Sequence, residues 1–345
     1  MLRIIYIDLE ESYLSSSNGR FVKEINLNNV RNNLAQLELA TKPQLADATG
    51  LSVVTINSLV KELLVTGEIQ KDETTPSTGG RPAATYRFNY QYSLALILLF
   101  NEHHWKDELV ASVVDLRGET LISETHIIPV FHSSHFEDLI KRLLSLYPAI
   151  KIIAIGIPGQ AVNGEITVSS HERLKGLRMV DTLQNTFTIP VLLENDVNAA
   201  VSGYCAHTCQ EKNTCVVAVY FPDKYPPGVG IYLNGHIVKG KNGMAGEIKF
   251  LPLDVTWDGG WESEEFIEVA CTIVQTLNAV LAPDQIVLYQ NVVSENQFQT
   301  AWSHYESKYE MASKPDIILS RPFQDDFHEG IQSLALKELR PENKL

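Results

Sequence analysis

The sequence predicts an α/β protein that begins with a winged helix-turn-helix. Two segments with helical spacing of apolar residues meet at Gly50, and two strand-like segments follow, a succession typical of that module. After about residue 91, apolar runs of strand length alternate with helical segments, which indicates an α/β body. We therefore divide the chain into an N-terminal arm (1–19), the winged helix-turn-helix (20–90) and the body (91–345). The arm is expected to be disordered or to add a strand to the body.

The helices of the module are predicted from capping residues and apolar spacing. Thr41 is a good N-cap, and Gln44 follows three residues later, as in a capping box. Gly50 supplies the turn, and Ser52 is placed to cap the next helix. The apolar positions are Leu27, Val30, Leu34 and Leu37 in the first helix, and Val54, Ile56, Leu59, Val60, Leu63 and Leu64 in the helix after Ser52.

The helix after Gly50 is the candidate recognition helix. In a helix-turn-helix, the N-terminal part of this helix lies in the major groove. Hydroxyl and amide side chains can read base edges there, and a lysine can reach phosphate. The polar residues expected on its outward face are Ser52, Thr55, Asn57, Ser58 and Lys61. The alternative is an ordinary helical hairpin with a solvated polar face.

The segment after the recognition helix predicts a wing. Strands are expected over residues 67–71 and 85–88, with a loop between them. Gly79 and Gly80 let the backbone approach DNA closely, and Arg81 offers a guanidinium to the minor groove or to a phosphate. The alternative for this loop is a plain flexible linker.

Charge is distributed unevenly between the predicted domains. The chain has a net charge of −14, but residues 20–90 hold 8 Lys+Arg and 7 Asp+Glu, a net +1. Residues 91–345 hold 19 Lys+Arg and 32 Asp+Glu, a net −13. A DNA-binding module is therefore compatible with the acidic total, but its weak charge favours a dimer that presents two modules.

The chain shows no sign of a membrane or secreted protein. Its longest apolar run, Leu94–Phe100, has the length of a strand, and its first residues lack the basic region of a signal peptide. Its four cysteines do not form a metal-binding pattern, so we expect structural thiols. We expect a cytoplasmic protein.

Two of the apolar runs in the body end abruptly, one at a Pro-Gly pair and one at three polar residues. Pro158 and Gly159 close the run at residues 152–157, and Glu194-Asn195-Asp196 follows Val191-Leu192-Leu193. Because binding sites in α/β sheets lie beyond the carboxyl ends of the strands, we expect a site that includes both groups.

Two sets of motifs resemble the ROK family (repressor, open reading frame, kinase). In the module, Gly79-Gly80-Arg81-Pro82-Ala83 with Tyr86 and Phe88-Asn89 is similar to the N-terminal domain of ROK regulators. In the body, the matching motifs are Gly156-Ile157-Pro158-Gly159, Glu194-Asn195-Asp196-Val197-Asn198, and Asn242-Gly243-Met244-Ala245-Gly246-Glu247. The resemblance implies a sugar-kinase-like effector and dimerisation domain over 91–345. The fold implied for this domain has two ribonuclease-H-like lobes, as in actin and hexokinase, with a sugar cleft between them.

The resemblance also implies a set of ligand contacts. Asp196 occupies the position of the catalytic base in the kinases, Asn195 and Glu247 resemble sugar-hydroxyl ligands, and Pro158-Gly159 borders the same site. Two structural alternatives stay open. Asn195-Asp196 can simply cap the following helix, and Glu247 can be a surface carboxylate.

The nucleotide side departs from the kinase pattern at three places. The stretch Leu99–Trp105 has neither the glycines nor the aspartate of the family's first phosphate loop. Pro226-Pro227 stands where a glycine-rich second loop is usual, which removes two backbone donors. Tyr289-Gln290 replaces a glycine pair beside the nucleotide. These changes favour a sensor over an enzyme and leave Asp196 as a vestigial base, so no residue is assigned as catalytic.

The zinc cluster of many ROK proteins is also missing. Phe250 stands where those proteins carry a histidine that contacts the sugar and precedes the cluster, and no cysteine follows before Glu265. We expect no metal and no cofactor. Trp257 and Trp261 lie nearby and either stack on a sugar or fill the volume of the lost zinc loop; we favour the second.

The sequence therefore predicts a cytoplasmic repressor that forms a homodimer or tetramer. Its partners are a double-stranded DNA operator and a sugar or sugar phosphate, which the kinase-like domain senses without phosphorylating it. The alternatives are an active ATP-dependent sugar kinase with a DNA-binding appendage, and a regulator that has lost its sugar ligand.

Overall fold

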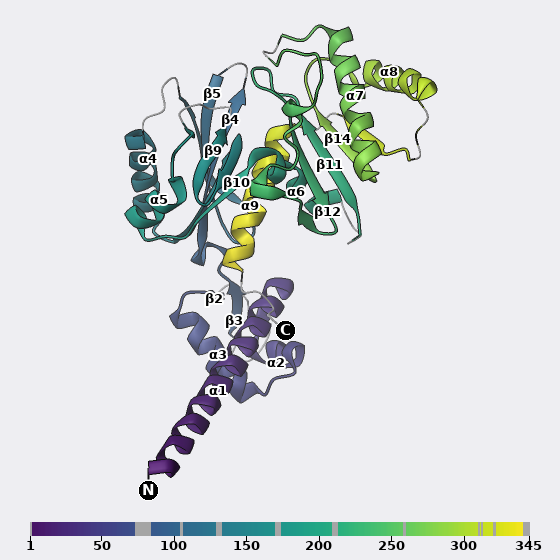
Figure 1. The fold of residues 1–345 in the computed structure, drawn as a ribbon. Coiled ribbons are helices and arrows are strands. Elements are labelled where there is room, and N and C mark those ends of the chain that lie inside the picture. Colours follow the sequence, from purple (N-terminus) through teal and green to yellow (C-terminus); the bar gives the residue numbers. More distant parts are fainter. Residues whose placement is uncertain are drawn as a thin grey trace. The chain divides into compact units, whose positions relative to one another are not determined.

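The computed structural model divides the chain into two compact units (Figure 1). One unit is Met1–Ser93 with Arg340–Leu345, and the other is Leu94–Leu339. We describe each unit by itself and call them the N-terminal unit and the kinase-like unit. The structure describes residues 2–72, 84–103, 106–128, 133–169, 174–208, 213–257, 260–309, 311, 313–319 and 322–340.

The N-terminal unit combines helices with a small antiparallel sheet. Its strands are ordered β1–β3–β2. The elements are α1 (Leu2–Leu37), β1 (Ala40–Thr41), α2 (Lys42–Thr49), α3 (Val53–Val65), β2 (Ile69–Asp72), β3 (Thr85–Phe88) and the 3₁₀ turn η1 (Tyr90–Tyr92). Helix α1 continues through residues 2–19, where the sequence predicted a disordered arm or an added strand.

The caps predicted around α2 and α3 are present. Thr41 accepts a hydrogen bond from the backbone of Gln44, whose side chain accepts one from the backbone of Thr41. Gly50 adopts the left-handed conformation with φ of 70°, and Ser52 accepts a hydrogen bond from the backbone of Thr55. The left-handed Gly50 ends α2, and the Ser52 cap starts α3. The two helices are bent by 112° relative to each other.

The core of the N-terminal unit is smaller than the apolar pattern predicted. It contains Leu27, Val30 and Leu34 of α1, Leu45 and Ala46 of α2, and Ile56, Leu59, Val60 and Leu63 of α3. Leu37, Val54 and Leu64 were expected in this core, but all three are exposed. The buried positions of α3 follow one stripe, and Val54 lies on the other side of the helix.

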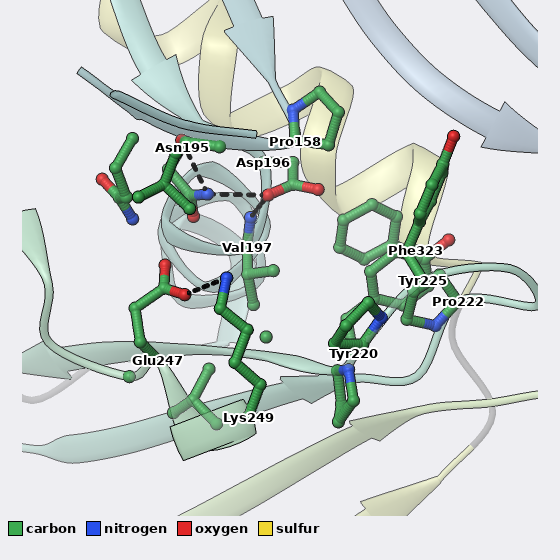
Figure 2. Close-up of a pocket in the computed structure, with 18 of the residues that line it drawn as sticks. Pro158, Asn195, Asp196, Val197, Tyr220, Pro222, Tyr225, Glu247, Lys249 and Phe323 are labelled. Carbon is green, nitrogen blue, oxygen red and sulfur yellow. Dashed lines mark hydrogen bonds and ion pairs between the residues drawn. The ribbon is translucent and has the colours of Figure 1, made fainter. Parts of the chain in front are cut away.

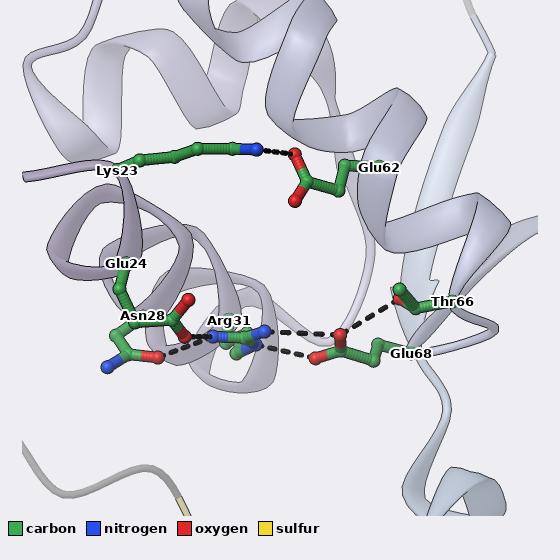
Figure 3. Close-up of polar contacts among 7 residues, drawn as sticks. All are labelled: Lys23, Glu24, Asn28, Arg31, Glu62, Thr66 and Glu68. Atoms are coloured by element: carbon green, nitrogen blue, oxygen red, sulfur yellow. Dashed lines mark hydrogen bonds and ion pairs between the residues drawn. The ribbon is translucent and has the colours of Figure 1, made fainter. Parts of the chain in front are cut away.

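A buried ion pair ties α1 to the turn before β2 (Figure 3). Arg31 Nε donates to Glu68 Oε2 at 2.6 Å and Arg31 Nη2 donates to Glu68 Oε1 at 3.1 Å, so the pair is bidentate. Glu24 and Asn28 accept from Arg31 Nη1, and Thr66 donates to Glu68. The network therefore holds the end of α3 against α1.

The kinase-like unit contains two five-stranded sheets with the same strand order. Within each sheet, three strands form an antiparallel meander. A fourth strand pairs parallel to the first strand of the meander, and a fifth pairs parallel to the fourth. The first sheet is β10 (Val191–Asn195), β7 (Ile150–Ile157), β4 (Leu94–His103), β5 (Lys106–Val114) and β6 (Thr120–Ile127). The second is β13 (His236–Ile237), β12 (Gly228–Leu233), β11 (Cys215–Tyr220), β14 (Gln285–Tyr289) and β15 (Asp316–Leu319).

Helices form layers around and between these sheets, as Figure 1 shows. α4 (Ser133–Leu146) and α5 (Met179–Phe187) cover the first sheet, and α7 (Ser263–Leu281) and α8 (Glu295–Lys308) cover the second. α6 (Asp196–Thr208) and α9 (Phe323–Leu339) pack between the two sheets. The two-lobed α/β body expected from the resemblance is therefore present.

The central helices approach each other unusually closely. A Cβ on Gly203 of α6 would lie 2.0 Å from the Asp326 carbonyl oxygen of α9, and one on Gly330 of α9 would lie 1.9 Å from that of Ala199. Glycine at both positions lets the helix backbones touch, which brings the two sheets onto one shared core.

Smaller elements complete the kinase-like unit. A two-stranded hairpin, β8 (Gly159–Val162) and β9 (Glu165–Ser169), follows β7 directly. Two 3₁₀ turns, η3 (Lys241–Gly243) and η4 (Ile248–Phe250), lie after β13. Among the described residues, no single helix is long and apolar enough to cross a membrane. Helices α2 and α3 reach that length and composition only when they are taken together, as a bent pair.

Candidate functional site

The five ligand residues predicted from sequence line one pocket in the kinase-like unit (Figure 2). Pro158 and Gly159 come from the junction of β7 and β8, and Asn195 and Asp196 from the junction of β10 and α6. Glu247 comes from the turn before η4. Strands β7 and β10 are parallel neighbours, so their carboxyl ends meet at one edge of the sheet, as predicted.

Asn195 and Asp196 have structural roles as well as a place in the pocket. Asn195 Oδ1 accepts from the backbone of Asn198, which caps α6, and its Nδ2 donates to the Gly159 carbonyl at 3.1 Å and to Asp196 Oδ1 at 2.8 Å. Asp196 Oδ1 also accepts from the backbone of Val197 at 2.9 Å. The helix-cap interpretation of this pair is therefore correct for Asn195, and the same contacts orient the Asp196 carboxylate.

The Asp196 carboxyl is strongly perturbed. Its residue is only 8% exposed, and this burial raises the pKa of Asp196 to about 7, with a further contribution from the negative charge of Glu247. Hydrogen bonds from Val197 and Asn195 oppose the shift. Near neutral pH this carboxyl therefore exchanges between its protonated and ionised forms, which is the property required of a general base.

Glu247 is paired with a lysine that sequence reasoning missed. Lys249 Nζ lies 2.9 Å from Glu247 Oε2, and both side chains line the pocket. Ile248, between them, is buried in the second lobe, so positions 247 and 249 face the pocket in alternation. Glu247 is half-buried, so the surface-carboxylate alternative is wrong. The alternation around Ile248 was the available signal for Lys249.

Aromatic rings form the opposite wall of the pocket. In the view of Figure 2, Asp196 lies between Asn195 and Glu247 on one side and the rings of Tyr220 and Phe323 on the other. Those two rings stack with their centroids 3.6 Å apart. Behind them, Tyr289 packs edge-on against Phe323 and donates a buried 2.7 Å hydrogen bond to Asp326. The bulky residue that follows Leu288 in the sequence thus supports this wall from outside the pocket lining.

The turn after β11 reaches across to the first lobe. Tyr225 Oη donates to Asp107 Oδ1 at 3.0 Å, and Lys224 Nζ lies 3.3 Å from Asp107 Oδ2. Pro226 and Pro227 follow and line the pocket, where neither nitrogen carries a hydrogen to offer a phosphate. We call Asp107, Lys224 and Tyr225 the clasp.

The stretch where the sequence predicted a degenerate phosphate loop begins at the end of β4. β4 and β5 stay paired as far as His103 opposite Lys106. Asn101, on β4, lines the pocket, and its buried Oδ1 accepts no hydrogen bond from the described residues. The pocket therefore offers an amide acceptor at this point.

The predicted DNA-contacting residues lie together on one side of α3. Asn57, Ser58 and Lys61 are exposed, Ser52 is exposed at the N-cap, and Thr55 is partly buried. Ser52 and Thr55 hydroxyls are also 2.9 Å apart, so their first role is to cap the helix. Gly79, Gly80 and Arg81 lie outside the described residues.

The residues near the missing zinc loop lie away from the pocket. Phe250 is 74% exposed and is not part of the lining. Trp257 and Trp261 pack against each other and against the core of the second lobe, which agrees with the volume-filling interpretation. The part of the chain that the structure describes holds no group of three or more His, Cys, Asp or Glu side chains placed to share a metal ion.

Curated relatives of the chain are transcription regulators. It is 23% identical to the xylose repressor of Bacillus spizizenii over 245 residues, which are 68% of this chain and 62% of that protein. It is 22% identical to the DNA-binding transcriptional dual regulator NagC of Escherichia coli over 248 residues, which are 69% of this chain and 59% of NagC. The chain thus spans less than two thirds of the length of these relatives.

Solved structures with a similar fold include both regulators and kinases. A ROK family transcriptional regulator described as a homolog of the E. coli MLC protein matches with a TM-score of 0.55 and 17% identity, over 92% of this chain and 99% of the other. The ROK hexokinase of Thermus thermophilus matches with a TM-score of 0.53 and 16% identity, over 71% of this chain and 99% of the other. At these identities the likeness concerns the fold alone.

A family model agrees with the fold and with the motifs around the pocket. It covers residues 107–272, a range that contains Pro158, Asp196 and Glu247 and most of both sheets. The matching model is that of the ROK family, and this chain therefore contains a ROK family domain.

Proposed function

We propose that this protein is a sugar-responsive DNA-binding transcription regulator, a cytoplasmic homodimeric repressor whose kinase-like unit senses a sugar without phosphorylating it. Two proteins to which it is similar are named as a xylose repressor and as a DNA-binding transcriptional dual regulator, NagC. The observation that carries the proposal is the two-sided pocket. Polyol-binding groups surround Asp196, and rings and prolines occupy the side where a kinase binds phosphate.

The architecture of the N-terminal unit supports DNA binding. Two helices bent by 112° and a following pair of antiparallel strands have the order and pairing of a winged helix-turn-helix. In that module α3 is the recognition helix. Its outward residues Asn57, Ser58 and Lys61 supply an amide, a hydroxyl and an ammonium for base edges and phosphates.

The polar side of the pocket supports a sugar ligand. Asp196 and Glu247 accept hydrogen bonds from hydroxyls, Lys249 donates, and Asn101 has an unused acceptor. Carboxylate and amide groups set against an aromatic wall are the usual composition of a pocket for a polyol with one apolar face. In this proposal the sugar binds more tightly at one angle between the lobes and so favours that conformation. Because sugar binding and DNA binding are then thermodynamically coupled, the sugar changes the affinity for the operator.

The closed phosphate side supports sensing over catalysis. Phosphoryl transfer depends on backbone donors and cations placed around the transferred phosphate. Pro226 and Pro227 lack such donors, Lys224 is engaged by Asp107, and Tyr220 with Phe323 fills the adjacent wall.

One observation favours the alternative of an active sugar kinase. The pKa of Asp196, raised to about 7 mainly by burial, suits a general base that takes a proton from a sugar hydroxyl. A kinase, however, also needs ATP, and the clasp and the ring wall stand on that side of the pocket.

Calorimetric titration with a panel of aldoses, their phosphates and their acids tests the proposal. We expect heat from at least one of these ligands, no heat from ATP with magnesium, and no ADP when both are mixed. The variant Glu247→Gln should weaken sugar binding, while Glu295→Gln, at the exposed start of α8, serves as the matched control. ATP binding together with steady formation of a sugar phosphate contradicts the sensor and establishes the kinase.

A further inference from the structure

The outward face of α3 carries an exposed valine that neither packing nor helix formation explains. The Val54 side chain is 80% exposed. It lies one turn before Asn57 and Ser58 and two turns before Lys61, on the same side of the helix. Valine is a poorer helix former than alanine, lysine or glutamate, so an exposed helical position gains nothing from it locally.

The charges around Val54 restrict what can cover it. Lys61 is the basic residue of α3, and Glu62, its acidic residue, pairs at 2.7 Å with Lys23 of α1. The exposed part of the helix around Val54 therefore presents amide, hydroxyl and ammonium groups, with no carboxylate among them. A polyanion can approach this face closely without meeting a like charge.

The position of Val54 is also rigid. It is the second residue of α3, directly after a helix start held by the Ser52 cap and by the Ser52–Thr55 hydroxyl contact. The β-branched side chain has little χ1 freedom in a helix. A contact made by Val54 therefore loses little conformational entropy and is made at a defined place.

We propose that Val54 packs against the C5-methyl group of a thymine in the major groove and helps to determine the operator sequence. This inference rests on the proposed DNA-binding function. Thymine alone presents a methyl group on the floor of the major groove, and an apolar side chain distinguishes it by contact. Residues at the N-terminal end of a recognition helix are the ones that reach base edges. Val53, partly exposed beside it, widens the apolar contact.

The test begins with selection of duplexes from a random pool by the full-length chain. Each thymine of the selected site is then replaced in turn by deoxyuridine, which removes the methyl group and keeps the base pair. At one or two positions we expect roughly fourfold weaker binding, the effect of losing one buried methyl group. Val54→Ala should weaken binding by a similar factor and should be insensitive to the same replacement.

A valine at the other end of the helix provides the control. Val65 is 81% exposed, and it lies eleven residues after Val54, at the C-terminal end of α3. Val65→Ala should bind the selected duplex as the wild type does and keep its sensitivity to deoxyuridine.

Each remaining outcome counts against the inference. If no deoxyuridine replacement matters, or if Val54→Ala stays as sensitive as the wild type, Val54 does not read a thymine methyl, although the DNA-binding function stands. If the chain selects no duplex at all, the proposed function fails and the inference fails with it. Thermal unfolding of both valine variants should match the wild type, because both side chains are exposed.

Discussion

The hydroxyl of Tyr225 donates a 3.0 Å hydrogen bond to Asp107 Oδ1, and this contact joins the turn after β11 to the start of β5. The two strands belong to different sheets of the kinase-like unit. The clasp therefore joins the two lobes beside the pocket. In the sensor that we propose, the clasp together with Pro226 and Pro227 separates ligand binding from phosphoryl transfer.

Removing the Tyr225 hydroxyl tests the clasp. Tyr225→Phe is expected to lower the free energy of unfolding by about 1 kcal/mol, the typical contribution of one hydrogen bond. It should also speed dissociation of the sugar, because the lobes separate more readily. Urea denaturation and stopped-flow ligand release measure the two effects. Tyr309→Phe, at an exposed position after α8, is the control, and equal behaviour of the two variants would count against a clasp.

The pKa of Asp196 predicts a pH-dependent stability. The folded protein holds this proton up to about pH 7, whereas the ordinary pKa of an aspartate side chain is 3.8. Between these values the folded state binds more protons than the unfolded state, so this group lowers stability as pH rises. The penalty is absent below the lower value and complete above the upper one.

Replacing Asp196 with asparagine removes this penalty while keeping the acceptor for Val197 and Asn195. Asp196→Asn should therefore gain stability relative to the wild type as pH rises from about 4 to about 7. The gain should reach about 4 kcal/mol, because the pKa of Asp196 differs by about three between the folded and unfolded states. Urea denaturation of both proteins over this range measures the difference. A difference that stays flat, or that shrinks as pH rises, contradicts the assignment.

The Arg31–Glu68 pair predicts a large loss of stability in the N-terminal unit. Arg31→Ala leaves the buried Glu68 carboxylate without its bidentate partner, and such a loss costs about 3 kcal/mol or more. Breaking the exposed Lys23–Glu62 pair by Lys23→Ala should cost less than about 1 kcal/mol. Chemical denaturation, monitored through the loss of DNA binding, measures the unfolding free energy of the two variants. Equal losses of unfolding free energy would show that burial does not increase the contribution of the Arg31–Glu68 pair.

The sequence was most informative where structure is determined locally. The Thr41–Gln44 capping box, the left-handed Gly50 and the Ser52 cap each depend on residues within a few positions, and each is present. The ends of β7 and β10 were also predictable, because the apolar runs stop there at Pro158-Gly159 and at Glu194-Asn195-Asp196. The two-residue strand β1 was missed, since so short a segment has no periodicity.

Other features depend on partners far away in the chain. Asp107 and Tyr225 are 118 residues apart, so no local pattern announces their contact. Val54 was placed in the core because it is apolar, although the spacing of Ile56, Leu59 and Leu63 already put it on the opposite side of the helix. The sequence pattern did not predict Lys249 as a pocket residue, whereas Phe250, the next residue, is exposed outside the pocket.

The most direct test of the whole account is the affinity of the full-length chain for a selected operator duplex, measured by fluorescence anisotropy with and without each sugar of the panel. We predict that at least one sugar or sugar phosphate changes the operator Kd by tenfold or more without ATP, the size of an ordinary allosteric coupling. We also predict that Asp196→Asn or Glu247→Gln abolishes this change and leaves DNA binding intact. An operator affinity that no sugar alters, or one that changes only when ATP is consumed, would contradict a sugar-sensing regulator.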